Sequence, residues 1–296
     1  MIFNINNIKT TLLFLIVCLA WGTTWITIKF SVESIPPLMS SGLRFLVAFP
    51  VFFMLAKINK IKILPATGEI KFYCIATIFY FSIPFALINY GEIYLSSGLA
   101  ALIFSSMPIL ILIFSHFMLH EKINIFQTVG IFLGFIGFFF ILKSQGYEFD
   151  FKNSAGIIAL FLAATMHAGY YVYVKKEGSK INSIAMNTLP LGIAGLILFT
   201  IGLIFEPVEI NKISHKSIIS VIYLGLFASV IGFIAYFELL KKISAVHISF
   251  VFLIFPVFAL VFSSILEPKV NINFEFLVYF SLILFGFSMT KIDKKP

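Results

Sequence analysis

The sequence has little charge, a single arginine and very little cysteine. Only 11% of its 296 residues are charged, whereas a typical soluble domain has about a quarter. The two cysteines, Cys18 and Cys74, lie in or beside apolar runs, so no disulfide framework is expected. Apolar residues take the place of the missing charge. They make up 60% of the chain and give it a mean hydropathy of +1.05.

Sequence motifs for nucleotide hydrolysis and for common catalytic sites are also absent. There is no G-x-x-x-x-G-K-[ST] phosphate loop, no H-E-x-x-H and no G-x-S-x-G. His116 and His120 have the i, i+4 spacing of a metal-ligand pair, but no third ligand accompanies them. We therefore expect a protein that is not an enzyme, with no catalytic residue, no metal site and no cofactor.

The apolar residues gather in runs of about 20, the length of helix that crosses roughly 30 Å of hydrocarbon. The runs are continuously apolar and do not alternate, which argues against a membrane barrel. Short connections rich in Pro, Gly, Asn and Ser leave no room for a soluble domain. The sequence predicts an all-α integral membrane protein with ten transmembrane helices. The predicted helices are residues 10–30, 36–56, 71–91, 96–119, 124–142, 154–174, 184–205, 216–239, 244–266 and 272–290.

Lysine falls mostly on one side of the predicted membrane. Both termini and the loops after the second, fourth, sixth and eighth spans hold 14 lysines, and the other five loops hold 5. Because cytoplasmic segments carry the excess of positive charge, we predict that both termini are cytoplasmic. Loop lysines also explain the net charge of +8, so we expect no nucleic-acid partner.

Short patterns recur 146 residues apart. LAWGTTWITIKF at residues 19–30 returns as LAATMHAGYYVYVKK at residues 162–176, and YGEIYL returns as YFELLK. Each half would hold five spans, an odd number, so the second half enters the membrane from the opposite side. We predict a 5+5 inverted-topology repeat, with one unit at residues 1–145 and the other at residues 146–296. Such a repeat is typical of transporters that work by alternating access.

The same segments resemble a known family. WGTTWITIK followed by PPLMSSGLRFLVA, then YGEIYLSSGLAA and GIFLGFIG, are similar to the drug/metabolite transporter (DMT) superfamily, and the chain resembles its EamA-type ten-helix members over nearly its whole length. The resemblance implies a central cavity lined by spans 1–4 and 6–9, with spans 5 and 10 peripheral. It also implies a bacterial inner-membrane protein, since members are typically exporters of amino acids, catabolites or drugs. His167 departs from the family pattern, which often has Trp there.

Two cations lie inside apolar runs. Arg44 is about 12 Å along the helix axis from Pro36, and a cation at that depth costs about 2.5–3.5 kcal/mol on insertion scales. It would either attract a carboxylate or phosphate of the substrate, or pair with helix-end carbonyls or Glu92. Lys29 would either belong to the solute pathway or extend its ammonium to the membrane interface.

Aromatic side chains with a polar edge suit a pocket that binds an amphipathic solute. Trp21 and Trp25 form an i, i+4 pair on one helix face, and the repeat echoes them as His167 and Tyr171. Anchoring at the membrane interface is the alternative role. The candidate substrate-binding residues are Trp21, Trp25, Arg44, Asn89, Tyr90, His167, Tyr171, Tyr236 and His247.

Two further features concern movement and packing. Prolines within the spans loosen backbone hydrogen bonding and are candidate hinges. They are Pro84, Pro108, Pro190 and Pro256. Gly130, Gly134 and Gly137 form a small-residue stripe suited to close helix packing, either within the chain or in a homodimer.

Together these features predict a secondary transporter of small amphipathic metabolites, such as amino acids or related compounds, that exports them by alternating access. Import by the same fold is one alternative, and an integral-membrane transferase is another. Besides the small-molecule substrate, the expected partner is membrane lipid. His167 and His247 could couple transport to protons. Because every acidic residue lies in a loop or near a helix end, facilitated exit or exchange is the simpler expectation.

Overall fold

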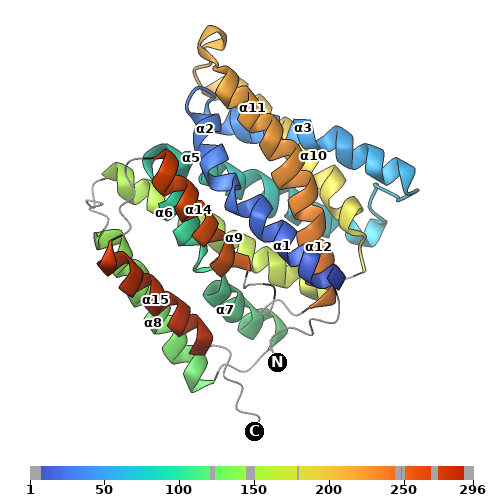
Figure 1. The fold of residues 1–296 in the computed structure, drawn as a ribbon. Helices are drawn as coiled ribbons and strands as arrows, with labels where there is room; N and C mark the ends of the chain where they lie inside the picture. Colours follow the sequence, from blue (N-terminus) through green and yellow to red (C-terminus); the bar gives the residue numbers. More distant parts are fainter. Residues whose placement is uncertain are drawn as a thin grey trace.

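A computed structural model describes residues 8–120, 124–144, 151–178, 180–243, 248, 251–267 and 273–289. Every regular element among these residues is helical (Figure 1). Seven helical runs are long and apolar enough to cross a membrane, namely Ile8–Val32, Pro37–Ile58, Thr67–Tyr94, Ser97–Leu119, Asn153–Gly178, Ser183–Phe205 and His215–Lys242. Three shorter apolar helices, Ile125–Ile141, Val251–Leu266 and Phe274–Gly286, lie where the fifth, ninth and tenth spans are predicted. The predicted all-helical membrane fold is confirmed.

The first half of the chain contains α1 to α8. Their bounds are α1 (Ile8–Gly22), α2 (Thr24–Val32), α3 (Pro37–Ile58), η1 (Thr67–Glu69), α4 (Ile70–Ile75), η2 (Ala76–Ser82), α5 (Ile83–Tyr94), α6 (Ser97–Phe104), α7 (Met107–Leu119) and α8 (Ile125–Ser144). The second half contains α9 (Phe151–Tyr173), η3 (Val174–Gly178), α10 (Ser183–Phe205), η4 (Ile210–Lys212), α11 (His215–Tyr223), η5 (Leu224–Ile231), α12 (Gly232–Lys242), α14 (Val251–Leu266) and α15 (Phe274–Met289).

Several spans are interrupted part-way along their length. The first span breaks at Thr23, whose hydroxyl donates to the Leu19 carbonyl at 3.0 Å. The fourth breaks at Ser105 and Ser106, whose hydroxyls also bond carbonyls of the preceding turn. Such bonds from serine and threonine to the backbone favour bending of a helix.

The third and eighth spans each contain a π-helical segment, η2 and η5. A shift of 146 residues makes the two segments overlap, so the wide turns occupy related places in the predicted repeat. Wide turns of this kind are rare and frequently occur at functional sites.

The predicted hinge prolines occupy two kinds of position. Pro84 and Pro108 stand in the first turn of α5 and α7, directly after an interruption. Pro190 and Pro256 lie inside α10 and α14, which continue through them.

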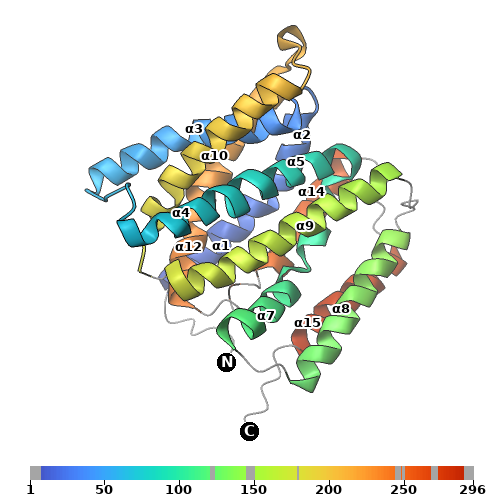
Figure 2. The same cartoon turned by 180° about the vertical axis from the view of Figure 1, so that it is seen from behind.

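The helices pack in pairs that join the two halves of the chain. The second and seventh spans, α3 and α10, lie together, as do α6 with α14 and α8 with α15. The first span packs through α1 on α12 and α14, and the sixth packs through α9 on α5 and α7 (Figure 2). A two-fold relation between the halves would generate each of these pairs.

Two of the pairs depend on glycine. A Cβ atom at Gly42 of α3 would lie 2.4 Å from the backbone nitrogen of Phe199 in α10. A Cβ atom at Gly286 of α15 would lie 2.6 Å from the Gly130 carbonyl oxygen and 2.9 Å from the Gly134 nitrogen of α8. The small-residue stripe is therefore used for packing within the chain, at the edge of the molecule where α8 and α15 lie (Figure 1).

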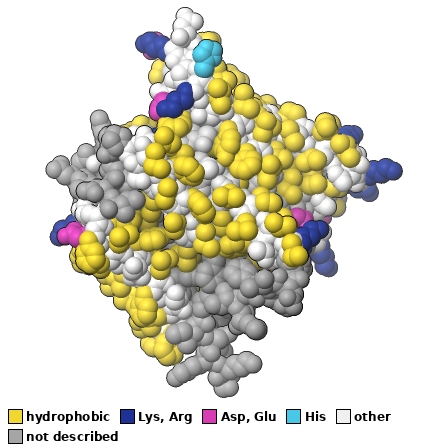
Figure 3. Space-filling model, in the orientation of Figure 1, with side chains coloured by type: hydrophobic (Ala, Val, Ile, Leu, Met, Phe, Trp, Pro, Cys, Tyr) yellow, Lys and Arg dark blue, Asp and Glu magenta, His cyan; other side chains and the backbone are white. Residues whose placement is uncertain are grey.

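The outside of the molecule carries the apolar surface expected next to lipid. On the face seen in Figure 3, hydrophobic side chains fill the middle and the charged side chains gather toward the margins. Glu206 shows how such a margin is built, because its carboxylate accepts hydrogen bonds from the Leu38 and Met39 amides at 2.8 and 3.0 Å. These amides belong to the first turn of α3, where the N–H groups have no carbonyl partner within the helix.

Candidate functional site

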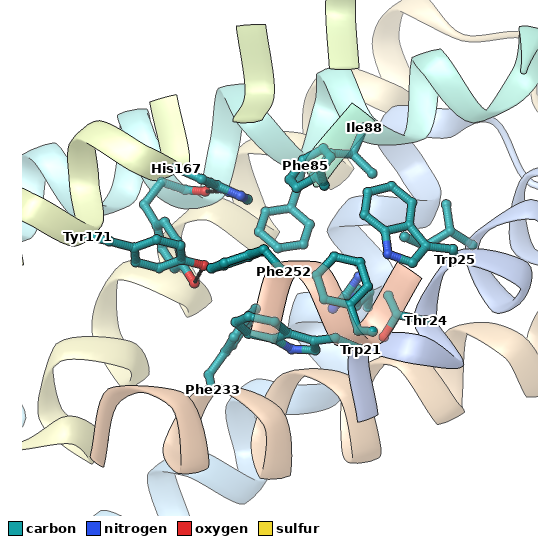
Figure 4. A pocket seen from close by; sticks show the side chains of 14 residues that line it. Trp21, Thr24, Trp25, Phe85, Ile88, His167, Tyr171, Phe233 and Phe252 are labelled. Atoms are coloured by element: carbon teal, nitrogen blue, oxygen red, sulfur yellow. Dashed lines mark hydrogen bonds between the residues drawn. The ribbon is translucent and has the colours of Figure 1, made fainter. Parts of the chain in front are cut away.

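A cavity of about 50 Å³ lies in the interior between the first, second, third, fourth, sixth, eighth and ninth spans (Figure 4). Its lining consists mainly of aromatic side chains. The lining residues are Trp21, Thr24, Trp25, Ile28, Arg44, Tyr80, Phe85, Ile88, Phe104, His167, Tyr171, Phe233, Phe252 and Phe255. Five of the sequence candidates thus meet at one site, although they come from three different spans.

The two tryptophans form one wall of the cavity. Trp21 belongs to α1 and Trp25 to α2, on either side of the break at Thr23. The Trp21 ring lies 4.8 Å from the Tyr236 ring, and the Trp25 ring stacks on Phe255 at 6.0 Å. Both tryptophans are buried, so they serve the interior and do not anchor the helix at a membrane interface.

Close approach of α12 holds Trp21 in place. A Cβ atom at Gly232 would lie 2.7 Å from the indole nitrogen of Trp21, so a larger residue would displace the ring. Tyr236, one turn further along α12, packs its ring 4.5 Å from Tyr171. Tyr236 is therefore behind the cavity wall and supports two of the residues that line it.

Arg44 is the cation of the site. Its side chain is 2% exposed, and its Nε donates to the Ser229 hydroxyl of η5 at 2.8 Å. The guanidinium carbon lies 4.8 Å from the centroid of the Phe85 ring, a cation–π distance. No described carboxylate lies within ion-pair distance of Arg44, so the alternative pairing with Glu92 does not occur in this structure.

His167 is fixed by a backbone carbonyl. Its Nε2 lies 3.1 Å from the Tyr80 carbonyl oxygen. Pro84 has no N–H to offer that carbonyl four residues back, which helps to leave it open to the histidine. Since a carbonyl only accepts, Nε2 carries the proton in this bond. Tyr80 also lies close to Tyr171, with 3.3 Å between the two hydroxyl oxygens.

Most of the buried polar atoms that lack a hydrogen-bond partner at the cavity are hydrogen-bond donors. Among the described residues, the Trp25 Nε1, one Arg44 terminal nitrogen (Nη1) and the Tyr236 hydroxyl are buried and make no hydrogen bond. Buried polar groups without partners are costly, and in native structures they call for an explanation. An acceptor-rich group such as a carboxylate, attached to an apolar body, would satisfy the arginine and indole donors.

The remaining sequence candidates lie elsewhere. Asn89 is buried and donates to the Pro37 carbonyl at 3.2 Å, which ties α5 to the start of α3. Tyr90 is 38% exposed, and its ring packs against Tyr94 on the surface. His247 falls outside the described residues.

Lys29 binds the carboxyl-terminal end of α5. Its ammonium donates to the carbonyls of Glu92 and Leu95 at the end of α5. Lys175, which is 146 residues further, donates to the carbonyls of Leu240 and Ile243 at the end of α12. Both lysines thus neutralise the negative end of a helix, and neither lines the cavity.

Several lining residues carry no signal in the sequence. They are Phe85, Phe104, Phe233, Phe252 and Phe255, and the chain has 38 phenylalanines from which to choose. Tyr80 could have been predicted from Pro84, because a proline has no N–H for the carbonyl four residues before it. Among the described residues no group of three His, Cys, Asp or Glu side chains is arranged to hold a metal ion.

Comparison with known proteins gives the family context. The sequence pattern of the EamA-like transporter family matches residues 8–143 and 154–291. A protein of Buchnera aphidicola subsp. Schizaphis graminum (strain Sg), named "Uncharacterized transporter", is 42% identical over 254 residues, covering 86% of this chain and 85% of its own. An Escherichia coli (strain K12) protein named "Probable amino-acid metabolite efflux pump" is 25% identical, covering 91% of this chain and 90% of its own.

The fold also has a counterpart among crystal structures. One solved chain superposes with a TM-score of 0.71 at 17% sequence identity, covering 95% of this chain and 96% of the other. At that identity the likeness concerns the fold alone.

Proposed function

The chain belongs to the EamA-like transporter family, and from this premise we propose that it exports small amphipathic solutes that carry a carboxylate, such as amino acids or related compounds. The family makes it a membrane transporter. The substrate class and the direction are the proposal.

The observation that carries the substrate class is the unpartnered nitrogen of Arg44 in an aromatic cavity. Hydrogen bonds to a charged group contribute about 1.5–3 kcal/mol net, which corresponds to roughly 10- to 150-fold in affinity. The surrounding rings would bind the apolar part of the solute, and the unbonded Trp25 N–H would add a second donor to its carboxylate.

The size of the cavity supports a transport cycle with moving walls. A volume of about 50 Å³ has room for a few water molecules, at roughly 10–15 Å³ of such volume each, which is less than an amino acid needs. Solute entry therefore requires the walls to separate. The interruptions at Thr23, at Ser105 and in the π-helical segments η2 and η5 lie in spans that line the cavity, so they provide points at which these spans can bend.

The proposed direction rests on the relative named as an efflux pump. Comparing metabolites in the medium of cells with and without the gene tests it. We expect the solute to accumulate in the medium when the protein is present, whereas depletion from the medium would mean import.

The substrate class is tested with purified protein in liposomes loaded with amino acids and, separately, with their methyl esters. Arg44→Gln should slow efflux of the free acids by roughly 10- to 100-fold and leave the esters, which lack the carboxylate, little changed. Lys212→Gln is the matched control, since Lys212 is an exposed cation that pairs with Glu209 on a loop. Equal losses for acids and esters in Arg44→Gln would refute the assignment.

A further inference from the structure

A second buried polar group lies away from the cavity. Glu92 belongs to the last turn of α5 and is 0% exposed. Neither of its carboxylate oxygens has a hydrogen-bond partner among the described residues. The proposed transport function makes no use of this side chain.

The nearest cation is already engaged. The Lys29 ammonium donates to backbone carbonyls, that of Glu92 itself and that of Leu95 at 2.8 Å. No ion pair within 4.0 Å joins Lys29 to the Glu92 carboxylate, although both side chains are described. Lys29 is therefore a positive charge near the Glu92 carboxylate that makes no direct bond to it.

The nearest other carboxylate is fully provided with donors. Glu267, after the end of α14, accepts from the Ser97 amide at 3.2 Å, from the Ser97 hydroxyl, and from Ser263 at 3.3 Å. The Ser97 and Ser263 donors thus go to Glu267, and none of them reaches Glu92.

Among the side chains that the structure describes, the other elements packed on α5 offer Glu92 no ionised partner. On α9, Gly156 and Leu160 face Gly91, the neighbour of Glu92. On α3, the Arg44 guanidinium lies over the Phe85 ring and is bonded to Ser229. A buried ion without donors costs several kcal/mol. A carboxyl group in these surroundings is therefore stable as the neutral acid.

The repeat supplies the contrasting case. Glu238, which is 146 residues beyond Glu92, has a side chain that is 39% exposed. It accepts a hydrogen bond from the Ser183 hydroxyl and lies 3.6 Å from the Lys241 ammonium. Its carboxylate thus has a donor and a neighbouring cation, whereas Glu92 has neither a donor nor an ion pair among the described residues. The two related glutamates thus occupy opposite environments, one closed to water and one open to it.

We propose that Glu92 is a proton-binding site of the transport cycle. In an inverted repeat, the second access state arises when the halves exchange their arrangements, so Glu92 would then become as open as Glu238 is now. A water-exposed Glu92 loses its proton to the solvent, and it must regain a proton before it is buried again. The proton is released and regained on the same side, the one that we predict to be outside, so no proton crosses the membrane and the closing step depends on the pH of that side. This pH dependence rests on the proposed transport function.

The protonation state can be measured without any solute. Infrared spectra of the purified protein at neutral pH should contain the carbonyl stretch of a protonated carboxylic acid. Glu92→Gln should remove this band, and Glu238→Gln, the repeat-related control, should keep it. A wild-type spectrum without the band, or a band that persists in Glu92→Gln, would overturn the proposal. If Glu92→Gln does not fold, the wild-type band is followed as the pH is raised. A band that keeps its intensity at alkaline pH would exclude exchange of this proton with the solvent.

The pH dependence is measured in proteoliposomes with the amino-acid panel, at equal solute concentration and equal pH on both sides. Above the range in which a water-exposed carboxyl group holds its proton, each rise of one pH unit should slow exchange by the wild type by up to about tenfold, since Glu92 must regain a proton before it is buried. Glu92→Gln should keep its exchange rate across this range, and Glu209→Gln should behave as the wild type. Exchange by the wild type that does not change with pH would refute the role of Glu92 in the cycle alone. No movement of any solute in the panel would refute the proposed substrate class, while the infrared result on Glu92 would stand.

Discussion

At the scale of single residues, the site combines many rings with very few polar atoms. The rings provide burial of about 25 cal/mol per Å² of apolar solute surface, which is strong but not selective. Selectivity must come from the few donors, and the Arg44 Nη1 and Trp25 Nε1 atoms have no partner in the described part of the chain. Each donor should therefore have a measurable and separate effect on the affinity for a solute.

Trp25→Phe tests the smaller of these two donors. The substitution removes the indole N–H and keeps an aromatic ring against Phe255 and Phe104. A neutral hydrogen bond contributes about 0.5–1.5 kcal/mol, so we expect the half-saturating concentration for efflux to rise by about 2- to 10-fold. Tyr90→Phe is the control, because the Tyr90 hydroxyl is on the surface, and it should leave efflux unchanged. If Trp25→Phe leaves the half-saturating concentration unchanged, the indole N–H does not contact the solute.

Rare residue types could be predicted at this scale, and common ones could not. Arg44, the only arginine, and the tryptophan pair stand out in a chain of 38 phenylalanines, and all three line the cavity. Glu92 could be placed only near a helix end. Whether a helix end is covered depends on neighbours that are distant in sequence, here Lys29 and Glu267, and a sequence pattern does not contain that information.

At the scale of elements, the crossing of α3 and α10 is the closest contact between the halves that a glycine controls. Gly42 allows the two backbones to approach, and a Cβ atom there would lie 2.4 Å from the Phe199 nitrogen and 2.7 Å from its Cα. Because these are backbone atoms, no side-chain rotation relieves the clash. The helices would have to separate.

Gly42→Ala is therefore expected to destabilise the fold. Overpacking of a close contact costs about 1–3 kcal/mol, and the midpoint of thermal unfolding of the purified protein should fall accordingly. Gly68→Ala is the matched control, since no atom lies within 4 Å of a Cβ at that position. Equal midpoints for Gly42→Ala and the wild type would mean that α3 and α10 are not held this closely.

The apolar runs predict continuous helices better than interrupted ones. The second and seventh predicted spans, residues 36–56 and 184–205, agree closely with Pro37–Ile58 and Ser183–Phe205. The first predicted span, residues 10–30, consists of two helices that meet at Thr23. Hydropathy depends on composition, and a break depends on individual backbone hydrogen bonds, so the irregular turns around the cavity were not predictable.

At the scale of the whole molecule, the central question is which side each end of the cavity faces. The excess of lysine predicts cytoplasmic termini, and that orientation puts Glu92 and the ends of α5 and α14 on the outside. The family and the fold are the same for either orientation. The side on which Glu92 releases its proton does depend on the orientation, so the orientation needs its own experiment.

Cysteine labelling in intact cells provides it. In a chain with Cys18→Ala and Cys74→Ala, a single new cysteine is introduced at Lys62 or at Asn211, which are both exposed loop residues. A membrane-impermeant maleimide should label Asn211→Cys in intact cells, and should label Lys62→Cys only after permeabilisation. The reverse pattern would put both termini outside, and a Glu92 that opens to that side would then exchange protons with the cytoplasm. Labelling of both positions in intact cells would contradict a chain that crosses the membrane an odd number of times between residues 62 and 211, which the predicted count of five crossings requires.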